Sequence, residues 1–212
     1  MQEATNRSQA GGAGDMGKGE QTRQEIIRKA APIFNQRGYE GASLSDLMKA
    51  TGLKKGGIYR HFSSKEQLAA EAFDFAWQEA WSARTRGLES VTNSVDRLQQ
   101  LVVNFVKRRG VVPGGCPLLN TAVDSDDGSF VLRQRVRKAF AGWSNQVMTT
   151  IRTGIRKREV RPGIDARKVA TVMIATLEGA IMLSRLEKTD HALRAAQEYL
   201  DAYLEKEVRL QR

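Results

Sequence analysis

The sequence of 212 residues is poor in the residue types that build catalytic and metal centres, since it holds one cysteine and two histidines. The single cysteine, Cys116, excludes an intramolecular disulfide. His61 and His191 show no spacing typical of metal ligands, and no side chain stands in a catalytic nucleophile motif. We therefore expect no enzyme activity, no metal and no cofactor.

Long apolar runs are also lacking. The most apolar stretch, Val169 to Leu183, is interrupted by Glu178 and is shorter than the roughly 20 residues that a membrane-spanning helix needs. Residues 1–20 contain few large apolar side chains and lack the apolar centre of a secretory signal, so they are expected to form a disordered tail. Together with the single cysteine, these absences predict a soluble cytoplasmic protein.

Strand patterns are absent too, because apolar and polar residues never alternate over a sustained stretch. Helix signals are frequent instead. Capping boxes are expected at Thr22 with Glu25, Ser43 with Asp46, and Ser63 with Glu66. Later helices are expected to begin at Asn93, Pro117, Phe130, Asp165 and Asp190. The pattern predicts an all-α chain, in which a three-helix domain at 21–66 precedes a larger helical domain at 67–212.

Acidic residues are outnumbered, which gives a formal net charge of +10. Ten basic and five acidic side chains lie between Lys18 and Glu66. Such a surplus favours a polyanionic partner, either nucleic acid or an anionic membrane surface, although a merely solvated basic face has the same composition.

Two helices separated by a glycine turn identify the partner. Gly52 suits the positive φ that a tight turn between two packed helices requires, and a short helix at 55–62 follows. This spacing is that of a helix-turn-helix, whose second helix enters the major groove of DNA. A plain helical bundle with a basic face is the alternative.

The segment Ala50 to Phe62, read together with Gly38-Tyr39, Ser43 to Leu47 and Ser64 to Leu68, resembles the DNA-binding signature of the TetR (tetracycline repressor) family. The resemblance covers roughly residues 22–70. Two departures are Pro32 inside the first helix and Leu53, where valine is more usual. The resemblance and the chemistry of the side chains together predict the DNA-contacting residues Ser43, Ser45, Lys54, Lys55, Gly56, Gly57, Tyr59, Arg60, His61 and Lys65.

The family resemblance further implies that two helices near the C-terminus pair with their copies in a second subunit. The matching segments are 166–186 and 192–204, and a core within a single chain is the alternative. A two-fold dimer would demand a palindromic DNA operator. The expected interface residues are Val169, Met173, Thr176, Ala180, Leu193, Ala196 and Leu200.

A cavity for a small effector is implied between the DNA-binding end and the dimer interface. Aromatic and methionine side chains suit a lipophilic or aromatic ligand, although each of them also suits an ordinary core. The expected lining residues are Phe73, Trp77, Trp81, Phe105, Cys116, Leu119, Phe140, Trp143, Met173 and Glu178.

Two of these residues allow several interpretations. Glu178 interrupts an apolar helix and could meet a cationic ligand, bond across the dimer, or face water. Cys116 precedes Pro117 at a helix start, where a lowered thiol pKa would permit a redox switch; a small buried residue under a tight turn is the alternative.

The sequence therefore predicts a repressor that a ligand releases from its operator. An activator or global regulator without a ligand is the nearest alternative. An enzyme and a membrane-surface protein are less well supported by the residues.

Overall fold

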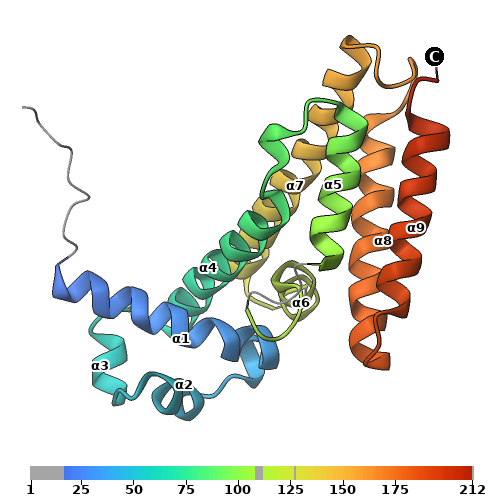
Figure 1. The fold of residues 1–212 in the computed structure, drawn as a ribbon. Coiled ribbons are helices and arrows are strands. Elements are labelled where there is room, and N and C mark those ends of the chain that lie inside the picture. The colour runs from blue at the N-terminus through green and yellow to red at the C-terminus, as the bar shows by residue number, and fades with distance from the viewer. Residues whose placement is uncertain (1–16, 108–111, 127, 212) are drawn as a thin grey trace, which may run out of the picture.

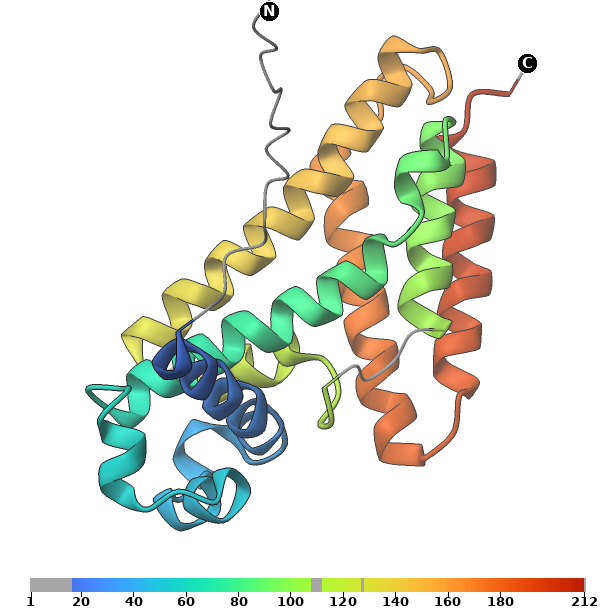
Figure 2. The same ribbon diagram turned by 60° about the vertical axis from the view of Figure 1, so that its left-hand side comes forward.

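A computed structural model of the chain describes residues 17–107, 112–126 and 128–211. Helices α1 (Lys18–Gly41), α2 (Leu44–Thr51) and α3 (Lys55–Tyr59) gather at one end of the molecule (Figure 1). Helices α4 (Lys65–Thr85) and α7 (Phe130–Arg156) run from that end toward an upright group formed by α5 (Ser94–Lys107), α8 (Ala166–Glu187) and α9 (His191–Tyr203). The short α6 (Pro117–Asp124) lies between the two ends, as Figure 2 also shows.

The described residues form no β-strand. The backbone pairs once in an isolated antiparallel bridge between Val160 and Arg209. A 3-10 turn, Leu88–Ser90, follows α4, and a π-helical turn, Leu204–Val208, extends α9. The all-α prediction is confirmed.

The N-terminal end has a small core of its own. Ile26 and Ile27 of α1, Leu47 of α2, Ile58 of α3 and Phe62 are all buried against one another. The predicted capping box is present, since the Ser43 hydroxyl accepts from the Asp46 N–H while the Asp46 carboxylate accepts from the Ser43 N–H. Gly52 ends α2 in the left-handed conformation, with φ of 73°.

The start of α1 differs from the prediction. Residues 1–16 of the expected tail lie outside the described residues, but Lys18 to Glu20 are helical. Thr22 is therefore inside α1, where its hydroxyl donates to the Lys18 carbonyl, and it forms no capping box with Glu25. The first turn tolerates polar residues because its N–H groups reach solvent.

The cap of α4 is displaced by one residue. Ser64, not Ser63, is the N-cap, and its hydroxyl accepts from the Gln67 N–H at 3.0 Å. Ser63 bonds to the Gln67 side chain instead. Glu66 is thus free of the cap and accepts from the Ser129 hydroxyl. Two adjacent serines offer the same local signal, so packing decides between them.

α4 continues without a break through the expected domain boundary at residues 66 and 67. Leu68 packs in the small core, whereas Phe73, one and a half turns later, packs in the large one. The two parts of the molecule are therefore joined by a continuous helix as well as by the contacts of α6.

The large core lies among α4 to α9. Asn93 caps α5 by accepting from the N–H groups of Val95 and Asp96, and Asp165 caps α8 in the same way. Asp190 precedes α9 without a side-chain capping bond. By length and composition α8 could cross a membrane, but half of its apolar window is buried inside this fold, as expected of a core helix.

Candidate DNA-binding surface and effector core

The face of α3 that points away from the small core is polar and basic. Lys54, Lys55 and Arg60 are exposed, and Tyr59 has 37% of its surface exposed. Ile58 is buried behind them and fixes the rotation of this five-residue helix. Burying Ile58 and Phe62 thus directs the predicted DNA-contacting side chains toward solvent.

Two lysine–tyrosine pairs mark the edges of this surface. The Lys55 Nζ lies 6.0 Å from the centre of the Tyr59 ring, and the Lys65 Nζ lies 4.5 Å from the Tyr39 ring. Tyr39 was not among the predicted contact residues, although Gly38-Tyr39 belongs to the resemblance. It joins the surface only because α1 and the start of α4 come together in the fold.

The remaining predicted contact residues have different positions. The Ser43 hydroxyl already donates to Asp46 Oδ2, and so it serves the cap of α2. Ser45 is exposed, whereas His61 and Lys65 are half-buried. Among the described residues, no acidic side chain forms an ion pair with Lys54, Lys55, Arg60 or Lys65.

Gly56 is not required by the fold itself. Its φ lies outside the left-handed region, and a Cβ added there would meet nothing within 4 Å. At Gly57 an added Cβ would lie 3.4 Å from the Leu53 side chain, which is ordinary contact. Glycine costs a helix about 1 kcal/mol relative to alanine, and neither the conformation nor the packing of the described residues requires it at 56.

A network of amide groups joins the N-terminal end of the molecule, formed by α1 to α3, to α6. The Asn120 Nδ2 donates to the carbonyls of Asn35 and Gly114 and to the Asn35 side chain, at 2.8 to 3.0 Å. The Asn35 Nδ2 in turn donates to the carbonyls of Pro113 and Gly115. These bonds tie α1 to both α6 and the segment before it.

The other end of α6 binds the break in α1. The Asp124 carboxylate accepts from the Tyr39 N–H at 2.6 Å. Gly38 adopts φ of 74° and ψ of 173°, and a Cβ there would lie 2.4 Å from Asp124 Oδ1. Glycine is therefore needed at position 38 for both its conformation and its closeness to Asp124. It interrupts α1, which ends three residues later at Gly41.

Three polar side chains meet inside the large core. Arg84 of α4, Cys116 before α6 and Glu178 of α8 are 5%, 2% and 8% exposed. The Arg84 Nη2 donates to Cys116 Sγ at 3.1 Å, and the thiol lies 3.0 Å from Glu178 Oε1. The Arg84 Nη1 is 3.9 Å from Glu178 Oε1, which is an ion pair too long for a hydrogen bond.

Aromatic rings surround the Arg84 guanidinium. Its carbon lies 4.4 Å from the centre of the Phe105 ring, 4.9 Å from Trp143 and 5.4 Å from Trp77. Such contacts stabilise a buried cation through the negative faces of the rings. Arg84 was missed by the sequence interpretation, although Trp77, Trp81 and Arg84 share one face of α4 at positions i, i+4 and i+7.

Burial governs the protonation of the two acids in this cluster. It raises the pKa of the Cys116 thiol to about 11, and the lowering effect of the Arg84 charge does not compensate. Burial likewise raises the pKa of the Glu178 carboxyl, against the opposing effect of Arg84. Cys116 does occupy the helix N-cap as predicted, but burial raises its pKa, whereas the sequence interpretation had considered a lowered one.

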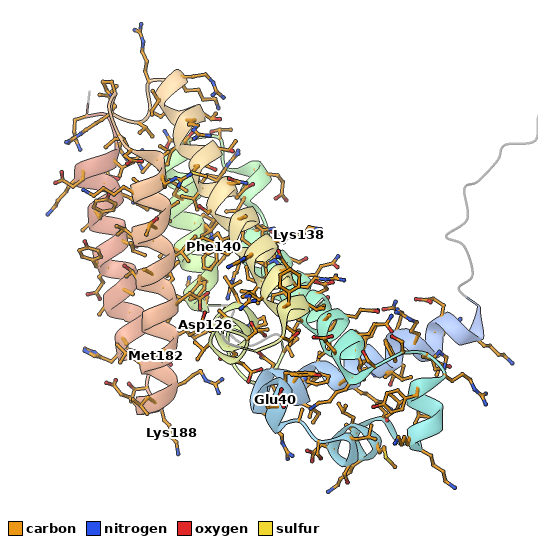
Figure 3. All side chains as sticks on the ribbon, turned by 180° about the vertical axis from the view of Figure 1, so that it is seen from behind. Glu40, Asp126, Lys138, Phe140, Met182 and Lys188 are labelled. Atoms are coloured by element: carbon orange, nitrogen blue, oxygen red, sulfur yellow. The ribbon has the colours of Figure 1, made fainter. Side chains whose placement is uncertain are left out.

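A groove of about 350 Å³ opens between α4 and α7. Phe73, Trp77, Trp81 and Trp143 line its inner side, and Trp77 and Trp81 stack with ring centres 5.6 Å apart. Asp74 and Arg135, which form an ion pair, lie on its polar side with Lys138, labelled in Figure 3. Four of the predicted ligand residues thus line one site.

The other predicted ligand residues are distributed differently. Phe105, Cys116 and Glu178 surround Arg84, whereas Met173 is completely buried in the core and Leu119 packs against that core outside the groove. Phe140 is 45% exposed on α7 and does not line the groove (Figure 3). The periodicity of α7 did not show that Phe140 faces outward, whereas Trp143 on the same helix faces inward.

The predicted interface residues lie mostly inside the single chain. Val169, Met173, Ala180, Leu193, Ala196 and Leu200 are all buried within the single chain, and Thr176 is half-buried. They hold α8 and α9 against each other and against the large core. The apolar side chains that remain exposed on these helices include Met182, Leu183, Leu186 and Tyr199 (Figure 3 labels Met182).

No group of three or more His, Cys, Asp or Glu side chains that could hold a metal occurs in the described part of the chain.

The chain matches two family models, one for bacterial regulatory proteins of the tetR family over residues 26–72, and one for a tetracyclin repressor-like C-terminal domain over residues 94–200.

Solved structures resemble the whole chain. A TetR transcriptional regulator from Chloroflexus aurantiacus is 44% identical, with a TM-score of 0.88 over 92% of this chain and 99% of that one. A TetR family regulator from Cytophaga hutchinsonii is 35% identical, with a TM-score of 0.87 over 94% and 100%. The transcriptional repressor DhaR of a Mycobacterium species is 28% identical, over 81% of this chain and 86% of its own length.

Proposed function

This chain belongs to the TetR family of bacterial regulatory proteins, and we propose that it is a cytoplasmic repressor that a small lipophilic or aromatic ligand releases from a palindromic operator. The observation that carries the proposal is the unpaired basic face of α3, connected through α6 to a buried polar cluster in an aromatic core. The printed name of DhaR, a transcriptional repressor, supports the direction of regulation.

We assign the DNA contacts to the exposed face of α3 and its neighbours. Lys55 and Arg60 are free to bind base edges or phosphates, and the Tyr59 hydroxyl to donate to a phosphate. Lys65, held over Tyr39, adds a charge-assisted contact at the start of α4. Gly56 permits the backbone of α3 to approach the DNA closely, which accounts for a glycine that the fold does not require.

We place the dimer interface on the outer face of α8 and α9. The exposed or half-buried residues of α8 recur every three or four positions, at Val172, Ala175, Gly179 and Met182. A stripe of this kind lets two helices pack closely. Tyr199 of α9 continues the apolar face. A two-fold pair would present two copies of α3, which a palindromic operator requires about 34 Å apart.

The coupling between ligand and DNA passes through α6. Its first residue follows Cys116, which bonds to Arg84 and Glu178 in the effector core. Its later residues, Asn120 and Asp124, bond to α1. A ligand that takes over the partners of Cys116 would shift α6 and, through it, α1. The two DNA-binding ends would then no longer match the operator spacing.

Fluorescence anisotropy tests the DNA-binding part of this proposal. The full chain is titrated onto a duplex from its own upstream region and onto a scrambled duplex, at two salt concentrations. We expect tight binding to the first alone, at two subunits or a multiple of two per site, that weakens as salt rises. Tyr59→Phe and Lys65→Ala should weaken it, while Lys157→Ala, at the far end of α7, should not. Equal weak binding of both duplexes by all variants would contradict the proposal.

A further inference from the structure

Three buried polar atoms around Arg84 have no hydrogen-bond partner among the described residues. They are the Arg84 Nη1, the Glu178 Oε2 and the Trp143 Nε1. Each belongs to a residue that is at most 8% exposed. They come from α4, α8 and α7, at positions that are tens of residues apart in the sequence. Buried polar atoms are nearly always paired in folded proteins, so three together indicate a missing partner.

The cluster adjoins the groove between α4 and α7. Trp77 and Trp143 line the groove and also contact the Arg84 guanidinium. Trp77 is only half-buried, and it separates the groove from the Arg84 guanidinium that its ring contacts. The stacked Trp77 and Trp81 rings offer a flat apolar wall beside these polar atoms. A ligand that fits has a planar apolar body and a compact polar head.

We propose that the effector is a planar aromatic carboxylate whose head group binds Arg84, Trp143 and Glu178 and whose rings pack against Trp77 and Trp81. This inference rests on the proposed function, since it names the ligand class of the same regulatory site. The carboxylate accepts from the Arg84 Nη1–H and the Trp143 Nε1–H, and Glu178 takes up a proton as the ligand binds, so that its Oε2–H donates to the carboxylate. All three unpartnered atoms then become donors to one anion.

The charges around the site favour an anion. The aromatic cage already holds the Arg84 cation, so a cationic head group would meet a like charge there. At the groove, Arg135 and Lys138 outnumber Asp74, which is paired with Arg135. The ionisable groups that face Glu178 are Arg84 and Cys116, and burial favours its neutral form. Electrostatic attraction therefore draws an anion inward.

Isothermal titration calorimetry of the full chain with three matched probes tests the inference. The probes are 2-naphthoate, 2-naphthamide and 2-naphthylmethylammonium, which share one ring system and differ in charge. We expect naphthoate to bind at least about tenfold more tightly than the amide, because a hydrogen bond to a charged group is worth roughly twice a neutral one. The ammonium probe should not bind measurably.

Variants locate the head group. Arg84→Gln should weaken naphthoate binding by about tenfold or more, and Trp143→Phe, which keeps a ring but removes the N–H, should weaken it a few-fold. Glu178→Gln keeps a donor without a charge and should bind naphthoate at least as tightly as the original chain. Arg137→Gln, at an exposed arginine of α7, is the matched control and should change nothing. A thermal melt of each variant identifies any variant that fails to fold. If Arg84→Gln fails to fold, Trp143→Phe still tests the head-group site.

Two results would overturn the inference. One is tighter binding of the ammonium probe that Glu178→Gln abolishes, which would assign a cation to the site. The other is no naphthoate binding by a chain that still binds its operator. Conversely, naphthoate binding that depends on Arg84 but leaves operator affinity unchanged would support the site and contradict the proposed release mechanism, so the two failures are distinguishable.

Discussion

Gly56→Ala should stabilise the protein and yet weaken its binding to DNA. The added methyl meets no atom within 4 Å in the chain, and the backbone at 56 is outside the left-handed region. Alanine is favoured over glycine in a helix by about 1 kcal/mol, which for a chain of this size raises Tm by about 2–4 °C. Since α3 has only five residues, this value is an upper limit.

The DNA side of the same substitution has the opposite sign. If the backbone of α3 lies against the duplex, an extra methyl is forced into a packed contact, which typically costs about 1–3 kcal/mol. A dimer carries the change twice, so the loss is about 2–6 kcal/mol, or at least roughly 30-fold in Kd.

Thermal unfolding and anisotropy on the operator duplex measure the two effects. Gly142→Ala is the matched control, because an added Cβ there also meets nothing within 4 Å and the residue lies on α7, away from α3. It should raise Tm without changing operator affinity. Unchanged operator affinity in Gly56→Ala would refute the close approach of α3 to DNA, whatever the change in Tm.

Three further predictions concern the rest of the molecule. Asn120→Ala removes the amide that joins α1 to α6, and losing about two hydrogen bonds, at about 1 kcal/mol each, should lower Tm by roughly 4–8 °C. The control Asn145→Ala, at an exposed residue, should leave Tm unchanged. Equal melting temperatures of the two variants would contradict the role of this junction. The buried Cys116 should resist iodoacetamide at pH 7.4, because its pKa is raised to about 11 and it holds about a hundredfold less thiolate than an ordinary thiol. Rapid labelling of the folded chain, detected by mass spectrometry, would contradict the burial. Ala175→Glu places a charge on the outer face of α8 and should yield monomers in light scattering. The control Ala141→Glu, on α7, should remain dimeric. A dimer in both cases would show that the interface lies elsewhere.

The DNA-binding end was predictable to a large extent because its signals are local. The capping box of Ser43 with Asp46 and the left-handed Gly52 act within a few residues of the chain, and both are present as expected. They set the limits of α2 and the turn, and from these the position of α3 follows. Where the local signal was ambiguous, as with Ser63 and Ser64, the prediction failed by one residue.

The groove between α4 and α7 and the buried cluster around Arg84 were only partly predictable. The aromatic side chains were identified by type, but neither their grouping in one groove nor the role of Arg84 follows from sequence spacing. An arginine near the end of α4 would ordinarily be assigned to solvent, because isolated buried charges are costly. Cys116 lies 32 residues after Arg84, and Glu178 lies 62 residues after Cys116, so only the folded structure reveals that the three side chains meet.

The sequence by itself determined the helices, the turn of the DNA-binding end and the family, because capping, glycine conformation and helical periodicity are set by neighbouring residues. Tertiary structure decided which face of each helix is buried. α8 is apolar around most of its circumference, so periodicity could not separate the residues that pack inside the chain, such as Met173 and Leu177, from those left outside, such as Met182. That choice depends on how α7 and α9 pack against α8, and their arrangement is a property of the whole fold.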